Sequence, residues 1–288
     1  MDYNYTENHP WWSDFDIFHH TENLMNPSTL FKKNYKIMNI VTAVLVALLL
    51  LCFVFSFDAE SGYLANGILT TVFFITYGIG AVVAFSAIFI PSEFETIITL
   101  NEITGKSRSR YTASGISIIL AGVLNLFLTK NIAQSKSELL SALGLVAFGL
   151  YVILLLTKNG YEFSLVKSVL LFVSIAFPTM IALANNQNYN YHINSIENYL
   201  SVLFACSFLA YILQTIKRLC YNKHSNWHFA TMLLTYMSGL SLSGAYVIAF
   251  LFNSVNEDNR FCQMIMILTV SIFVGIELNH FIEELDSK

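Results

Sequence analysis

Long apolar stretches separated by short polar ones run through most of this chain. A helix that crosses a bilayer needs about 20 mostly apolar residues, because each residue rises about 1.5 Å against a hydrocarbon core of about 30 Å. The stretches of that length are Ile37–Phe57, Tyr63–Ile90, Tyr111–Thr129, Leu139–Thr157, Phe163–Leu183, Tyr199–Ile216, Phe229–Phe252 and Phe261–Phe281. Backbone amides in lipid must be paired within their own element, and these runs are too long for barrel strands. The pattern therefore predicts an all-α, polytopic membrane bundle of about eight transmembrane helices.

Two of the predicted helices carry residues that favour a bend. Pro178 lies inside the fifth run, and Gly78 and Gly80 lie inside the second. Proline removes a helical hydrogen bond and kinks the chain, and transporters bind their substrates at such broken helices.

Composition agrees with a membrane protein. The chain of 288 residues is 55 % apolar and only 12 % charged, whereas soluble domains are about 25 % charged. The net charge is −4 and the basic residues are scattered. Without a basic patch there is no electrostatic footprint for nucleic acid, so that class of partner is excluded.

The basic residues predict the orientation of the bundle. With eight spans, all but three of the 15 Lys and Arg residues fall on one side; the exceptions are Lys130, Lys136 and Arg260. The sixth connection alone carries Lys217, Arg218 and Lys223. Because basic residues favour the inner side, we expect an integral protein of the plasma membrane with both termini in the cytoplasm.

Residues 1–30 form an acidic, aromatic leader ahead of the predicted membrane domain, residues 31–288. The leader has no Lys or Arg, so it does not resemble a secretory signal. Ser13, followed by two acids, favours a short amphipathic helix on the cytoplasmic face. Its acidity predicts docking on a basic connection or a protein partner through residues 1–28, rather than on anionic lipid. A loosely ordered tail is the alternative.

Two charged residues lie within the apolar runs. Lys167 and Glu277 each stand four residues, about 6 Å, from the cytoplasmic edge of their span. Ionisable groups at membrane depth are functional candidates. Their matched depth predicts an ion pair, although Lys167 can also extend its ammonium to the interface.

Three histidines join this candidate ionisable cluster. His280 follows Glu277 by three residues, and His224 and His228 are spaced i, i+4 at the start of the seventh helix. Antiparallel packing of the last two helices would bring all of these side chains to one level. Three interpretations follow: interfacial pairing and capping, a proton-linked or solute-linked role, or a divalent metal site. Bundle metal sites use two Glu-x-x-His motifs and this chain has one, so we predict no metal and no cofactor.

The seventh predicted helix also carries a face of small and polar side chains. Its candidate residues are Ser238, Ser241, Ser243 and Tyr246. Such a face can serve as a seam for close helix packing or line a path for a solute.

Other chemistry is not indicated. The four cysteines form no CxxC pair, and the chain has no HExxH, GxSxG or phosphate-binding glycine motif. No nucleophile, base and orienting group assemble at one depth, which argues against an enzyme. Two functions are left: a transporter of a small solute or ion, or the membrane subunit of one; and a non-catalytic sensor, scaffold or protective protein that acts through a partner.

Overall fold

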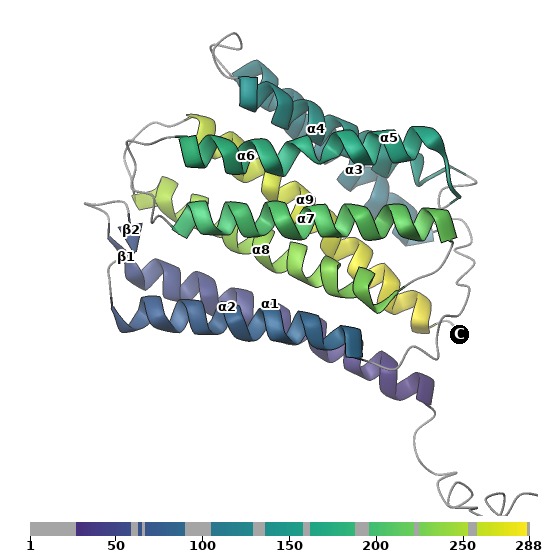
Figure 1. The fold of residues 1–288 in the computed structure, drawn as a ribbon, viewed down its shortest axis with the longest axis horizontal. Helices are drawn as coiled ribbons and strands as arrows, with labels where there is room; N and C mark the ends of the chain where they lie inside the picture. The colour runs from purple at the N-terminus through teal and green to yellow at the C-terminus, as the bar shows by residue number, and fades with distance from the viewer. Residues whose placement is uncertain are drawn as a thin grey trace, which may run out of the picture.

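The computed structural model describes residues 27–58, 63–64, 67–89, 105–128, 136–157, 162–187, 196–221, 225–252 and 258–286. The predicted amphipathic helix of the leader and His224 lie outside these ranges. Figure 1 shows a bundle of roughly parallel and antiparallel helices. Its elements are α1 (Pro27–Ser56), β1 (Phe57–Asp58), β2 (Tyr63–Leu64), α2 (Ile68–Ser86), η1 (Ala87–Phe89), α3 (Gly105–Leu128), α4 (Lys136–Leu154), α5 (Leu165–Ser174), α6 (Ala176–Gln187), α7 (Ile196–Tyr221), α8 (Asn226–Phe252) and α9 (Asp258–Asp286).

The prediction of eight long apolar helices is confirmed. Within the described residues, eight helical segments are long and apolar enough to cross a membrane, and each matches one apolar run of the sequence. The start of α1 and the end of α9 lie at the same end of the bundle (Figure 1). The sequence did not predict the short antiparallel pair of β1 and β2, which joins α1 to α2 with Phe57 opposite Leu64.

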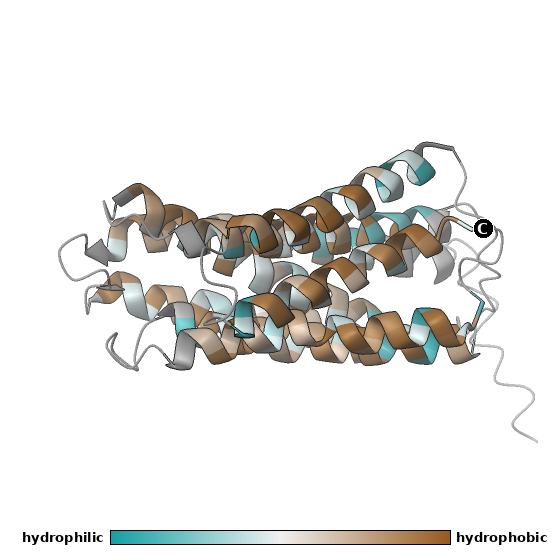
Figure 2. Cartoon of the chain, turned by 90° about the horizontal axis from the view of Figure 1, so that it is seen from above, coloured by the Kyte–Doolittle hydropathy of each residue, from teal (hydrophilic) through white to brown (hydrophobic). Residues whose placement is uncertain are grey.

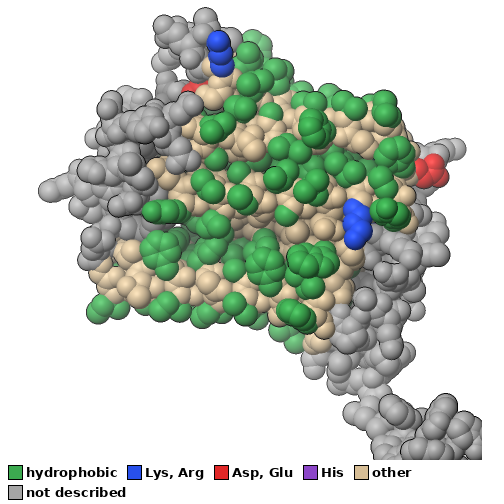
Figure 3. All heavy atoms as spheres, in the orientation of Figure 1, with side chains coloured by type: hydrophobic (Ala, Val, Ile, Leu, Met, Phe, Trp, Pro, Cys, Tyr) green, Lys and Arg blue, Asp and Glu red, His purple; other side chains and the backbone are tan. Residues whose placement is uncertain are grey.

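The outer surface of the bundle is apolar. Hydrophobic residues dominate along the helices in Figure 2, and hydrophobic side chains are spread across the described face in Figure 3, with few charged ones among them. Phe89 and Phe127 are 84 % and 82 % exposed, which is costly in water and favourable against acyl chains. This surface is compatible with a multi-pass membrane protein.

Helix α8 forms the centre of the bundle. It packs against α1, α2, α7 and α9. In its most apolar window 72 % of the residues are buried, against 28 % for α1 and for α2. A helix surrounded in this way holds its neighbours in register, so side chains from α7 and α9 can meet over its surface.

The helical hydrogen bonding of the fifth span, Leu165–Ala184, is interrupted at one residue near Pro178. α5 ends at Ser174, α6 begins at Ala176, and Ile175 between them donates its amide to the carbonyl of Phe172 at 3.2 Å. Pro178 has no amide proton, so the carbonyl of Ser174 lacks its usual helical donor. In α6, the backbone of Phe177 packs against Gly144 of α4. A Cβ added at Gly144 would lie 2.6 Å from the backbone nitrogen of Phe177. Glycine therefore permits the close approach of α4 and α6.

Candidate ionisable site between helices α7, α8 and α9

One face of α7 carries three polar side chains near the end of the helix. Tyr211, Thr215 and Arg218 follow one another at i, i+4 and i+7, which aligns them along the helix. The Thr215 hydroxyl donates to the carbonyl of Tyr211 at 2.8 Å. All three side chains are buried where α7 packs against α8.

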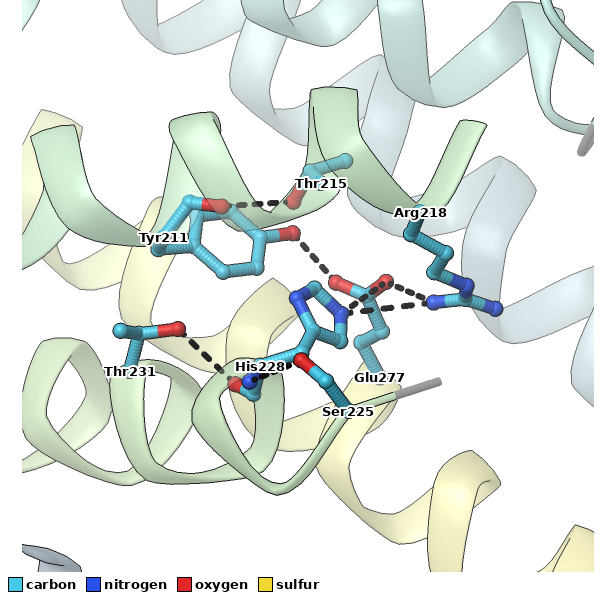
Figure 4. Close-up of polar contacts among 7 residues, drawn as sticks. All are labelled: Tyr211, Thr215, Arg218, Ser225, His228, Thr231 and Glu277. Carbon is cyan, nitrogen blue, oxygen red and sulfur yellow. Dashed lines mark hydrogen bonds and ion pairs between the residues drawn. The ribbon is translucent and has the colours of Figure 1, made fainter. Parts of the chain in front are cut away.

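Glu277 on α9 accepts hydrogen bonds from two of these side chains (Figure 4). The hydroxyl of Tyr211 donates to Oε2 of Glu277, and Nη1 of Arg218 donates to Oε1 at 3.1 Å. The side chains of Arg218 and Glu277 are only 6 % and 3 % exposed. Both carboxylate oxygens therefore have a donor, and a guanidinium offsets the carboxylate charge within the site.

His228 on α8 completes the arrangement. Its Nε2 lies 3.4 Å from Nη1 of Arg218 and 3.9 Å from Oε1 of Glu277. Its ring stacks on that of Tyr211, with centroids 5.7 Å apart and an angle of 20°. We call Tyr211, Arg218, His228 and Glu277 the Glu277 site.

The start of α8 fixes the position of His228. Ser225 precedes the helix, and its Oγ accepts the backbone amide of His228 at 3.2 Å. This is the hydrogen bond of a serine N-cap to the third helical residue. The Thr231 hydroxyl donates to the carbonyl of His228 at 2.9 Å. His228 is therefore held in the first turn, facing α7 and α9 (Figure 4).

An aromatic layer lies directly beside the site. Phe208 precedes Tyr211 by one turn of α7, and their ring centroids are 6.0 Å apart. Phe148 of α4 packs against Phe208 at 5.2 Å and against Phe273 of α9 at 5.5 Å. Phe208 precedes Tyr211 and Phe273 precedes Glu277, so both rings lie farther than the site from the C-terminal ends of α7 and α9. The three phenylalanines are fully buried, so apolar rings border the Glu277 site on this side.

The structure brings together two of the predicted ionisable residues and separates others. Glu277 and His228 meet, as expected from packing of the last two helices. The predicted pair of Lys167 with Glu277 is wrong. Nζ of Lys167 instead donates to the backbone carbonyl of Glu162 at 3.1 Å, close to the start of α5. The ring of His280 lies edge-on to Tyr111 of α3, with centroids 5.6 Å apart.

The counter-ion of Glu277 is Arg218, which the sequence pattern assigned to a connection. The apolar run ends at Ile216, but α7 continues to Tyr221. The long alkyl stem of arginine lets it follow an apolar helix face into a buried position. The spacing of Tyr211, Thr215 and Arg218 on one face was the signal that could have identified it.

The geometry does not suit the metal-site alternative. In the part of the chain that the structure describes, no group of three or more His, Cys, Asp or Glu residues could hold a metal ion. Glu277 and His228 offer two donors, and the guanidinium of Arg218 lies between them and would repel a cation.

The small polar face of α8 has the contacts of a packing surface. Ser238, Ser241 and Ser243 each donate to a carbonyl of their own helix, and Ser238 also lies 2.9 Å from the hydroxyl of Ser207 on α7. Tyr246 is 1 % exposed. At Gly239 an added Cβ would lie 2.1 Å from Oγ of Ser271 on α9. These contacts favour a packing seam over a solute path.

Comparison with known proteins found no family model, no curated protein and no solved structure that matches this chain.

Proposed function

We propose that this chain is a multi-pass membrane protein that transports a small solute or an ion, and that the Glu277 site is its functional centre. One observation carries the proposal: a charged, hydrogen-bonded site is buried where three membrane-length helices meet. Ionisable groups cost several kcal/mol at membrane depth and mark ion or substrate pathways in transporters. A protein that needed only a stable bundle could use apolar side chains at these positions.

The broken helix supports the same proposal. Transporters bind substrates beside discontinuous helices, because the ends of the half-helices and the freed backbone carbonyls can contact the substrate or coupling ion. Here the break between α5 and α6 connects to the aromatic layer. Phe177, two residues beyond Ile175, packs against Phe208 with ring centroids 6.0 Å apart. Movement of α6 would therefore disturb the side chains that close the Glu277 site.

We further propose that the protein resides in the plasma membrane with both termini in the cytoplasm. An even number of spans and the common end of α1 and α9 support termini on one side. The distribution of basic residues supports the cytoplasm as that side.

Transport is tested with the full chain reconstituted into liposomes on a solid-supported membrane, where charge movement is recorded as current. The probes are jumps of NaCl, KCl, a mixture of monocarboxylates and a mixture of amino acids, each at two pH values. The expected result is a current for at least one probe that Glu277→Gln abolishes. Glu283→Gln is the matched control, since Glu283 is on the same helix but forms an exposed ion pair with Arg110 at 3.7 Å.

Currents that persist unchanged in Glu277→Gln would refute the role of the site. No current with any probe, from monodisperse protein, would refute transport as a self-contained activity. In that case the alternative is a sensor, scaffold or protective protein acting through a partner bound by residues 1–28. The packed serines on α8 favour this alternative, because their hydroxyls donate to carbonyls of their own helix. Its test is co-purification of a stoichiometric partner from the native membrane, lost on removal of residues 1–28 and retained in Glu277→Gln.

A further inference from the structure

Two side-chain nitrogens approach the same carboxylate oxygen in the Glu277 site. Oε1 of Glu277 lies 3.1 Å from Nη1 of Arg218 and 3.9 Å from Nε2 of His228. The two nitrogens are themselves 3.4 Å apart. The first distance is a hydrogen bond and the second is about 1 Å too long for one.

The contact between the two nitrogens fits one protonation state of His228. A guanidinium carries only donors, so a hydrogen bond at 3.4 Å requires Nε2 of His228 to accept from Nη1 of Arg218. With Nε2 as the acceptor, the ring is neutral and its proton is on Nδ1. In this state the site has one positive and one negative charge, from Arg218 and Glu277.

A proton on Nε2 would reverse that contact. Nε2–H and Nη1–H would then be two donors on two cations, and neither could accept from the other. The nearest acceptor for Nε2–H is Oε1 of Glu277, and a charged hydrogen bond of about 2.8 Å requires a shift of about 1 Å. Oε1 has lone pairs for both donors, but protonated His228 and Arg218 would place two cationic nitrogens about 3.4 Å apart, and their repulsion favours departure of one of them.

We propose that Nε2 of His228 is a proton-binding site, and that a proton bound there displaces Arg218 from Glu277. The lone pair of Nε2 takes the proton from the aqueous phase at the end of the bundle where α7 and α9 finish. Nε2–H then donates to Oε1, and Nη1 of Arg218 leaves it. The inference rests on the proposed function and deepens it, because it names the proton as the coupling ion.

Several described groups that face His228 affect this balance. From α9, Glu277 attracts the proton; from α7, Arg218 opposes it and Tyr211 stacks on the ring. Ser225, just before α8, and Thr231 in α8 hydrogen-bond the backbone of His228, and the first turn of α8 adds a partial positive charge. Proton binding at Nε2 and departure of Arg218 from Oε1 are therefore coupled.

Arg218 has a place to move to. It stands in the last turn of α7, three residues before the helix ends at Tyr221. A cation in that position is stabilised by the free carbonyl groups of the helix end. Its flexible stem allows the guanidinium to extend toward water while its backbone stays in place.

The test is nitrogen-15 NMR of the full chain in lipid nanodiscs, with histidine and arginine labelled, between about pH 5 and 8. The variant His228→Gln assigns the His228 signals, and Arg218→Ala assigns those of Arg218. At the upper pH we expect Nε2 of His228 to be unprotonated and Nδ1 to carry the proton. On acidification Nε2 should become protonated, and the Arg218 side-chain signals should shift with the same midpoint. Glu277→Gln should remove this shared transition, and His280→Gln, on the same helix and outside the site, should keep it.

Three results would overturn the proposal: a proton on Nε2 at the upper pH, no titration of His228 in the range, or a titration that leaves the Arg218 signals unmoved. A circular-dichroism melt of each variant shows whether it is folded. If Glu277→Gln is unfolded, the wild-type titration with Arg218 observed directly still decides the question. The NMR result is independent of flux, so failure of every transport assay would refute the proposed function and leave the proton site standing.

Discussion

Arg218 on α7 and Glu277 on α9 stand 59 positions apart in the sequence, and their side chains meet at 3.1 Å inside the bundle. Neither helix supplies the contact alone, because both are held by α8, which packs against each of them. The pair therefore depends on the packing of α7, α8 and α9, and its removal is expected to destabilise the whole site.

Removal of one charge should cost more than removal of both. Arg218→Met leaves the Glu277 carboxylate buried without its counter-ion, and loss of one member of a buried pair costs about 3–5 kcal/mol. The double variant Arg218→Met, Glu277→Leu removes both charges and should recover much of that stability. Thermal unfolding in one detergent, followed by tryptophan fluorescence, measures both.

The exposed pair of Arg110 and Glu283 is the matched control for that comparison. Its side chains are 52 % and 57 % exposed, and surface pairs contribute about 0–1 kcal/mol. Glu283→Gln should therefore leave the melting temperature nearly unchanged. A double variant at Arg218 and Glu277 that is no more stable than Arg218→Met would contradict a charge-based explanation.

Tyr211→Phe should weaken the site without disturbing its packing. The change removes the hydroxyl that donates to Oε2 of Glu277 and keeps the ring that stacks on His228. A hydrogen bond to a charged group contributes about 1.5–3 kcal/mol, so the same melt should show a clear loss. Tyr199→Phe is the control, since Tyr199 is on the same helix and 50 % exposed. Equal effects of the two variants would argue against the hydroxyl.

Alanine should have opposite effects at two glycines. At Gly144 its Cβ would lie 2.6 Å from the backbone nitrogen of Phe177, so α4 and α6 must separate and stability must fall. At Gly78 nothing lies within 4 Å of the added Cβ, and alanine favours a helix by about 1 kcal/mol over glycine. We expect Gly144→Ala to lower the melting temperature and Gly78→Ala to hold or raise it. A neutral result at Gly144 would mean that α4 and α6 are not in close contact.

Pro178→Ala should join α5 and α6. The new amide at position 178 can donate to the carbonyl of Ser174, which the ring of proline prevents. Hydrogen exchange measured by mass spectrometry should then show slower exchange between residues 174 and 180. If the break is needed for transport, flux should fall while the melting temperature is maintained or rises. Unchanged flux with slower exchange would separate the break from the function.

The two ends of the bundle should face opposite sides of the membrane. Cys220, at the end of α7, and Lys136, at the start of α4, are both exposed. In a chain with Cys52, Cys206 and Cys262 changed to serine, a membrane-impermeant maleimide should label Cys220 only after the cells are permeabilised. With Cys220 also changed to serine, the variant Lys136→Cys should be labelled in intact cells. Labelling of both from the same side would refute the proposed topology.

The helices could be predicted from the sequence because each one forms its backbone hydrogen bonds within itself, and the length of its apolar run indicates the length of the helix. The break at Pro178 was equally predictable, since one missing amide produces it. The Glu277 site was only half predictable. Glu277 and His228 stood out as polar groups at the edges of apolar runs, on helices adjacent in the chain.

The partner of Glu277 could not be predicted from depth alone. Lys167 and Glu277 stand at the same level, but equal depth does not make two helices neighbours. α5 packs on α4 and α7, and Lys167 bonds the backbone of its own segment. Arg218 was missed because hydropathy marks the end of an apolar run at Ile216, whereas the helix and its buried face continue past it.

The depth of Glu277 has an electrical consequence. Glu277 is six residues from the end of its span at Glu283, which corresponds to about 9 Å along the helix. A proton that reaches the site from that end would cross only about a third of a hydrocarbon core of about 30 Å. A full crossing changes the energy of one charge by about 2.3 kcal/mol per 100 mV, so the entry step would change by about 0.8 kcal/mol. The membrane voltage would therefore act mainly on the passage through the aromatic layer, and transport should depend on voltage far more steeply than occupancy of the site does.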